Sequence, residues 1–175
     1  MAATEPLPIG AETWGFPHCR ECGYAWDTGF EEARVLIQEA PRRLRGLLKG
    51  QPHARRKPNA TTWSPSGYVW HLSDWFRIQA QRIYGISHDP DYVHVGYDQD
   101  DVAALFRYDE LPVASGLWAI ERSAEEFQLA TEDVDPATRF RHPDAGDITI
   151  EDVVRYVGHE APHHELDVRR GLGIA

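Results

Sequence analysis

The chain has 175 residues, a length that suits one hydrophobic core and leaves little for a second. Apolar residues make up 42% of it and charged residues 26%, which argues against a disordered chain and against a fibrous repeat. Lys and Arg number 18 against 28 Asp and Glu, and the resulting charge of −10 would repel a nucleic acid or an anionic membrane. We therefore expect a small-molecule substrate, no nucleic acid and no membrane partner, although residues 42–57 are locally basic.

The N-terminus shows no targeting segment, because no basic stretch is followed there by an apolar one. No apolar run approaches the ~18 residues that a transmembrane helix needs. The only two cysteines, Cys19 and Cys22, are too few for the disulfide framework of a small secreted protein. We expect a cytoplasmic protein.

Residues 1–27 are rich in Pro, Gly and Trp and show no periodicity, which predicts an irregular N-terminal extension that carries the C-x-x-C pair. The remaining residues, 28–175, are expected to form one helical domain. Its first helix is predicted from Thr28, as N-cap, to Lys49, with Gly50 after the last turn.

Three more helices follow. Ser64 is a favourable N-cap and Pro65 suits the first helical position, so the second helix should run to about Tyr84 or Gly85. Residues 87–101 are predicted as a loop, and residues 112–130 as the third helix. Thr149 and Asp152 have the spacing of a capping box for a fourth helix that ends before Gly171. Strands have little support, and the pattern predicts an all-α fold, an antiparallel four-helix bundle.

The fourth helix contains an H-E-x-x-H sequence from His159 to His163, the pattern of zinc metalloproteases. Pro162 interrupts the helix that would hold both histidines. The extended form of the motif fails as well, because Leu166 and Arg169 occupy its glycine and histidine positions. A metalloprotease is therefore not favoured.

A helical wheel gives another register for this segment. The apolar residues that define its buried face are Ile150, Val153, Val154, Val157, Ala161 and Val168. His164 lies within this face and Glu160 on its flank, whereas His159 and His163 lie on the far side. A kink at Pro162 could rotate this phase. Glu160 and His164 are thus the i, i+4 pair directed to the core, where a carboxylate and an imidazole are costly unless they share a metal or a proton.

His71 in the second helix is the candidate for a third ligand. With Glu160 and His164 it would form a two-histidine, one-carboxylate site with open coordination positions, a set that suits Zn²⁺ and also Fe²⁺. Asp74 and Asp167, each one turn beyond a candidate ligand, could orient the imidazoles. His163 and Asp74 are our candidate catalytic residues, with His163 as an acid or base.

These residues resemble a known family. A helix that opens with Trp63-Ser64 and carries His71, together with Glu160-x-x-x-His164 on a later helix, is similar to the DinB-like metal-binding four-helix bundles, in particular the mycothiol-dependent maleylpyruvate isomerases. The resemblance covers residues 28–172 and implies zinc bound by His71, Glu160 and His164. The chain departs from that isomerase by its Cys19-x-x-Cys22 extension and by ending soon after the fourth helix.

The resemblance implies a metal-dependent enzyme, a low-molecular-weight-thiol (mycothiol-type) transferase or isomerase that acts on a small electrophile. Zinc is the expected metal, with iron or nickel as alternatives. A related group, the ergothioneine-forming sulfoxide synthases, uses iron and an H-x-x-x-H pair, which His159 and His163 could imitate. A non-catalytic module that binds a metal or small ligand is the other alternative, and the bundle could form a homodimer.

Cys19 and Cys22 allow three interpretations. They could supply half of a structural zinc site that needs two more ligands, among them His18. They could be a redox pair, although no βαβ pattern surrounds them. They could also be two plain thiols in a reducing compartment.

Overall fold

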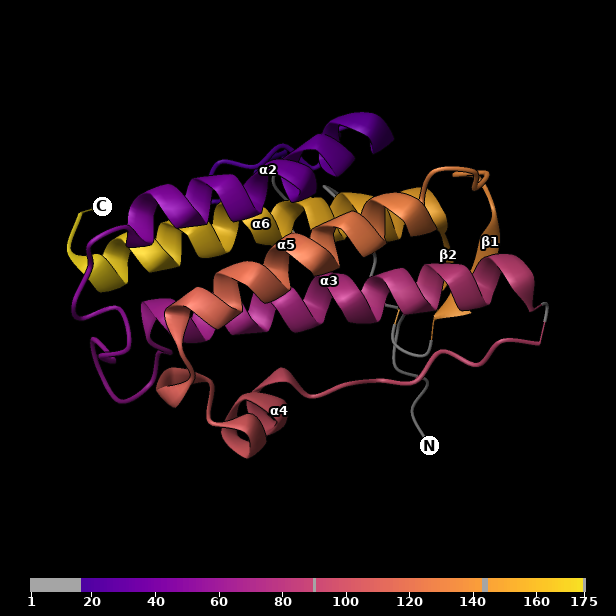
Figure 1. The fold of residues 1–175 in the computed structure, drawn as a ribbon. Coiled ribbons are helices and arrows are strands. Elements are labelled where there is room, and N and C mark those ends of the chain that lie inside the picture. The colour runs from indigo at the N-terminus through magenta and orange to yellow at the C-terminus, as the bar shows by residue number, and fades with distance from the viewer. Residues whose placement is uncertain (1–16, 90, 143–144, 175) are drawn as a thin grey trace, which may run out of the picture.

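The computed structural model describes residues 17–89, 91–142 and 145–174. Its body consists of four long helices, α2 (Phe30–Leu48), α3 (Pro65–His88), α5 (Val113–Ala130) and α6 (Ile150–Leu172) (Figure 1). A short helix, α4 (Gln99–Phe106), and a 3-10 turn, η1 (Tyr108–Glu110), lie between α3 and α5. Two short strands, β1 (Arg139–His142) and β2 (Gly146–Thr149), precede α6. The four-helix bundle predicted from the sequence is confirmed.

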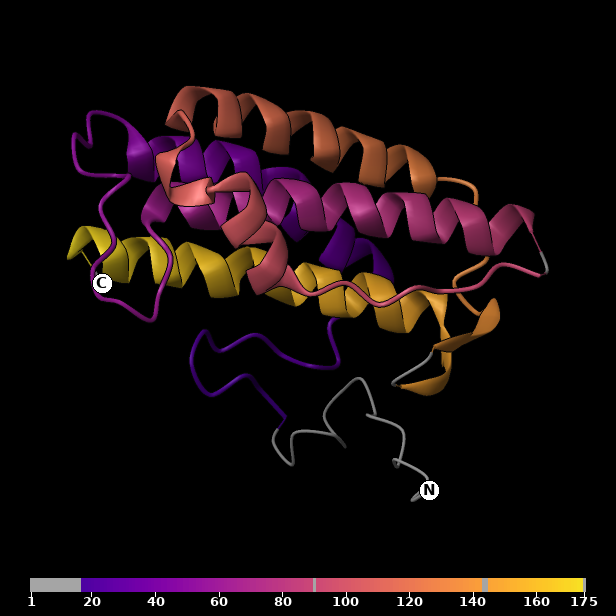
Figure 2. The same ribbon diagram turned by 90° about the horizontal axis from the view of Figure 1, so that it is seen from below.

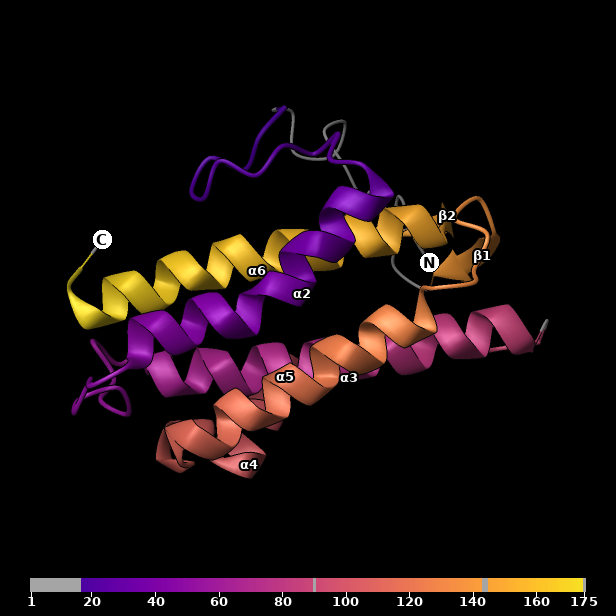
Figure 3. The same ribbon diagram turned by 45° about the horizontal axis from the view of Figure 1, so that its top comes forward.

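Each long helix packs mainly against two others: α3 and α2 each contact both α5 and α6. Figure 3 shows α2 beside α6, and α5 beside α3. Consecutive helices α2 and α3 run in opposite directions, as do α5 and α6. The helices α3 and α5 run in the same direction, because residues 91–98 return along the bundle before α4 begins (Figure 1). The contact between α3 and α6 brings the helix of His71 against the histidine-rich helix.

The predicted starts of α3 and α6 are confirmed by their caps. The Ser64 hydroxyl accepts a hydrogen bond from the backbone N–H of Gly67 at 3.0 Å, and Pro65 is the first helical residue. Thr149 and Asp152 form the reciprocal capping box that their spacing predicted. α6 continues through Pro162 to Leu172.

Three predicted helix ends differ from the structure. Thr28 is not the N-cap of α2, because its hydroxyl donates to the carbonyl of Ala25, and Gly29 takes the cap position. α3 passes Gly85 and ends at His88. Gly85 lies inside the helix, where the ring of Tyr92 occupies the space that a side chain would need. α6 likewise passes Gly171 and ends at Leu172, and its C-cap is Gly173, which adopts the left-handed conformation typical of that position.

The sequence reading also missed short elements. Residues 87–101 were predicted as a loop, yet α4 begins at Gln99, because the Asp98 side chain accepts hydrogen bonds from the next two aspartate N–H groups. The strands β1 and β2 pair antiparallel, with Phe140 opposite Ile148. Four-residue strands carry too little alternation for a pattern-based prediction.

The apolar face predicted for α6 is buried in the core, which it shares with α3, α2 and α5. Residues 17–27 of the predicted extension lie beside α6 (Figure 2); residues 1–16 lie outside the described part of the chain. The Tyr24 hydroxyl donates to the Arg155 carbonyl at 2.7 Å, and the Arg155 side chain donates to the Thr28 carbonyl at 2.9 Å. None of the described helices is long and apolar enough to cross a membrane.

Candidate metal centre

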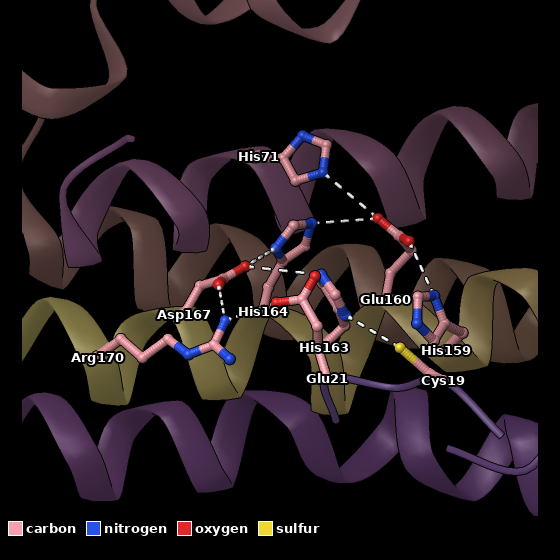
Figure 4. A network of polar contacts seen from close by, with 9 residues as sticks. All are labelled: Cys19, Glu21, His71, His159, Glu160, His163, His164, Asp167 and Arg170. Carbon is pink, nitrogen blue, oxygen red and sulfur yellow. Dashed lines mark hydrogen bonds and ion pairs between the residues drawn. The ribbon is translucent and has the colours of Figure 1, made fainter. Parts of the chain in front are cut away.

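His71, Glu160 and His164 meet between α3 and α6 (Figure 4). One potential ligand atom from each lies within 4.8 Å of the other two. His164 Nε2 is 3.1 Å from Glu160 Oε2, and His71 Nε2 is 3.8 Å from the same oxygen. The structure therefore brings together the three residues that the sequence predicted as ligands, in the register that the helical wheel favoured.

Burial shapes the electrostatics of this cluster. Side-chain exposure is 0% at His71, and burial lowers its pKa, which favours the neutral imidazole that binds metals. Burial also opposes a charged Glu160, but contacts with His159, His164 and His71 hold its pKa well below the usual value. For His164, burial is outweighed by Asp167 and Glu160, which raise its pKa.

The residues present fit a divalent metal ion. Neither ring nitrogen of His71 has a hydrogen-bond partner among the described residues, although both are buried. Such orphaned nitrogens are costly in a core, and a metal ion would satisfy one of them. The imidazoles and the carboxylate supply three ligands and leave coordination positions free, as in catalytic zinc sites.

His164 is oriented by Asp167, as proposed from the sequence. Its Nδ1 is 2.9 Å from Asp167 Oδ2, which leaves Nε2 directed at Glu160. Asp74 is placed differently: its carboxylate accepts a hydrogen bond from the Tyr108 hydroxyl and pairs with Arg77 at 2.9 Å. No hydrogen bond between Asp74 and His71 is found in the described part of the chain.

Aromatic rings surround the centre. Trp63 lies 4.9 Å and Trp75 6.3 Å from the His71 ring, measured between ring centroids, and Tyr68 lies 5.2 Å from the His164 ring. Trp70, next to His71 in the sequence, packs instead against Gly116 of α5. Helical spacing from His71 could have pointed to Trp75 and Tyr68, but Trp63 precedes the helix.

His159 and His163 face away from His71, toward the N-terminal extension. Cys19 Sγ lies 3.7 Å from His163 Nδ1, and the two imidazole centroids are 4.8 Å apart. Burial raises the pKa of the Cys22 thiol, but His159 and His163 outweigh it and bring that pKa to about 6. Contact with Cys22 is the main reason that the pKa of His163 rises to about 9; for His159, burial is outweighed by Cys22 and Glu160 and the pKa rises to about 10.

The contact between Asp167 and His164 leads to a prediction for metal binding. Replacing Asp167 by Asn weakens the hydrogen bond that fixes the His164 tautomer, so we expect metal affinity to fall about 10–100-fold. Titration of metal-free protein in competition with a chelator measures it. Glu165→Gln is the control: it makes the same charge change on the same helix, where Glu165 pairs with Arg169. Equal affinity in both variants would contradict a role for Asp167.

Comparisons with known proteins agree with this fold. The structure is similar to that of YfiT from Bacillus subtilis, with a TM-score of 0.70 and 17% sequence identity over 83% of this chain and 89% of that chain. YfiT is described as a probable metal-dependent hydrolase with an unusual four-helix bundle topology. No curated protein matches the chain. The family model of the DinB superfamily matches residues 36–166. Because this match spans well over half of the sequence, the chain belongs to the DinB superfamily.

Proposed function

We propose that the protein is a metal-dependent enzyme that transfers a low-molecular-weight thiol to a small electrophile or uses the thiol to isomerise it. The observation that carries this proposal is the convergence of His71, Glu160 and His164, a three-ligand set with open coordination positions. A metal held only for structure would call for a closed set of four protein ligands. The similarity of these residues to those of thiol-dependent members of the superfamily supports the choice of a thiol.

The roles of the protein residues follow from their positions. His71, Glu160 and His164 would hold the ion, and Asp167 would keep His164 in the required orientation. When bound, a divalent metal supplies Lewis acidity, which lowers the pKa of a coordinated thiol or water toward neutrality. Two imidazoles and one carboxylate suit zinc first, with iron and nickel as alternatives.

The rings of Trp63 and Trp75 make the surroundings of the centre apolar. Removal of water strengthens the electrostatic interactions within such a site. The acid–base role of His163 and the catalytic role of Asp74 stay predictions. In the structure His163 contacts Cys19, and Asp74 accepts a hydrogen bond from Tyr108.

A second candidate is hydrolysis, favoured by the similarity to YfiT, which is described as a probable metal-dependent hydrolase. The same open position that would receive a thiol could receive water. Iron chemistry through His159 and His163 is less favoured, since these residues are directed away from His71 and toward the cysteines. We infer a small-molecule substrate in either case, in keeping with the net charge of −10.

The thiol proposal is tested with zinc-loaded protein, mycothiol and monochlorobimane, a small electrophile whose thioether is fluorescent. We expect metal-dependent thioether formation that is lost in His164→Ala and retained in His53→Ala, which replaces an exposed histidine outside the centre. Hydrolysis of p-nitrophenyl acetate is measured on the same samples. Metal-dependent ester hydrolysis without any thiol reaction would contradict thiol transfer and favour the hydrolase. Full thiol turnover in His164→Ala would contradict the proposed centre.

A further inference from the structure

A second group of potential metal ligands lies next to the first, between the N-terminal extension and α6. It consists of four side chains whose ligand atoms all lie within 4.8 Å of one another: Cys19, Cys22, His159 and His163. Both cysteines are free thiols in the structure. This group shares no member with the centre formed by His71, and His163 is the one member to which the proposed reaction gives a predicted role.

The extension presents its two cysteines in a defined turn. The N–H of Gly23 donates to the Cys19 carbonyl at 2.9 Å, and the N–H of Cys19 donates to the Tyr24 carbonyl at 2.8 Å. Gly23 adopts φ 77°, a left-handed conformation that suits glycine. These bonds turn the chain back on itself, and Cys19 lies on the side that faces α6 (Figure 4). The Cys22 thiol belongs to the same group of ligand atoms.

The helix α6 presents the other two ligands. His159 and His163 are four residues apart, so their rings lie on one face of the helix, 4.8 Å apart between centroids. His163 Nδ1 is directed at Cys19 Sγ, at 3.7 Å. His159 is 8% exposed, and its Nε2 is buried without a hydrogen-bond partner among the described residues. That orphaned nitrogen indicates a missing ligand rather than packing alone.

We propose that this group binds a second zinc ion in a closed, structural Cys2His2 site that fastens the extension to α6. Two thiolates and two imidazoles are the closed tetrahedral set of structural zinc sites, and C-x2-C with H-x3-H has the usual ligand spacing. Zinc requires both cysteines as thiolates and both imidazoles neutral, so the protons that the cysteines and histidines share are released to solvent, and the two thiolate charges balance the charge of Zn²⁺.

The site also connects to the first centre through Glu160. His159 Nδ1 lies 3.2 Å from Glu160 Oε1, while Glu160 Oε2 faces His164 and His71 (Figure 4). A histidine that binds zinc through one nitrogen commonly donates to a carboxylate through the other. Zinc on His159 Nε2 would thus fix the ring that orients Glu160, so the second zinc acts as a positioning element for the first. With His163 as a zinc ligand, its predicted proton transfer no longer applies.

The test uses Co²⁺, whose absorption reports thiolate ligands and tetrahedral geometry. Metal-free wild-type protein should take up two equivalents, one of which produces the near-ultraviolet thiolate-to-cobalt band. The double variant Cys19→Ser/Cys22→Ser should lose that band and one equivalent. His71→Ala should keep the band. The control His18→Ala replaces an exposed histidine next to Cys19 that lies outside the group, and it should behave as wild type.

Wild-type protein without the thiolate band would overturn the site whether or not any variant folds, as would two thiols that remain fully reactive after zinc loading. Helical circular dichroism shows whether the double variant keeps its fold. Chelator competition then measures the remaining metal in that variant, and we expect its affinity to be about 10–100-fold weaker than in wild type. An unchanged affinity would overturn the positioning role. The thiol assay depends on His164 and on metal at the first centre, so the two proposals can fail separately.

Discussion

Replacing His71 by Ala should remove one equivalent of metal and abolish metal-dependent turnover. His71 is the only member of the first centre that comes from α3; Glu160 and His164 both belong to α6. Loss of one of three ligands should weaken binding by at least about 100-fold, beyond the 10–100-fold typical for an outer hydrogen-bond partner. Without the ion, nothing lowers the pKa of the reacting thiol or water, so kcat/KM should fall by at least about 100-fold as well. Elemental analysis and chelator competition measure the binding.

His94→Ala is the matched control for this experiment. His94 is also buried, with 8% exposure, and one of its ring nitrogens also has no partner within the described residues. Its ring stacks on that of Phe140, outside both ligand groups. Both variants replace a buried imidazole by a methyl group and should lose similar stability. A loss of metal seen in His71→Ala alone is therefore not a consequence of lost stability. Unchanged metal affinity in His71→Ala would show that the centre does not use this residue.

The clustering of His71, Glu160 and His164 was predictable because it depends on the phase of one helix. The apolar residues of α6 determine which side faces the core, and that side carries Glu160 and His164. Pro162 lies in the segment between them and leaves the helix continuous, so the phase holds. The position of His71 within α3 was predictable as well, because the cap at Ser64 determines where that helix begins.

The burial of His159 could not be predicted from a wheel. The wheel places this residue opposite the core, yet it is 8% exposed, because Tyr24 and Trp26 of the extension cover it. The extension has no periodicity that would indicate where it lies. The approach of Cys19 to His163 spans 144 residues along the chain and depends on tertiary packing alone. Both cysteines and both histidines were visible as pairs, and only the fold shows that they belong together.

Replacing Gly158 by Leu should destabilise the bundle and weaken both ligand groups. A Cβ at this position would lie 2.8 Å from the Cβ and 3.0 Å from the Cα of Ala33, a fully buried residue of α2. Backbone cannot yield as a flexible side chain can, so α6 must move away from α2. We expect the free energy of unfolding to fall by about 3 kcal/mol, the upper part of the range for overpacked cores. Since His159 and Glu160 follow directly, metal affinity should fall too.

Gly46→Leu controls for the glycine itself. Gly46 is an exposed residue within α2, and a Cβ there would meet no atom within 4 Å. Removing a helical glycine should raise stability by roughly 0.5–1 kcal/mol in that control. The smaller change Gly158→Ala tests the contact directly: combined with Ala33→Gly, which removes the opposing methyl group, it should recover part of its loss in urea denaturation. Strictly additive effects of the two substitutions on stability would contradict the close approach of α6 and α2. They would also contradict the packing of α6 that directs one ligand group toward α3 and the other toward the N-terminal extension.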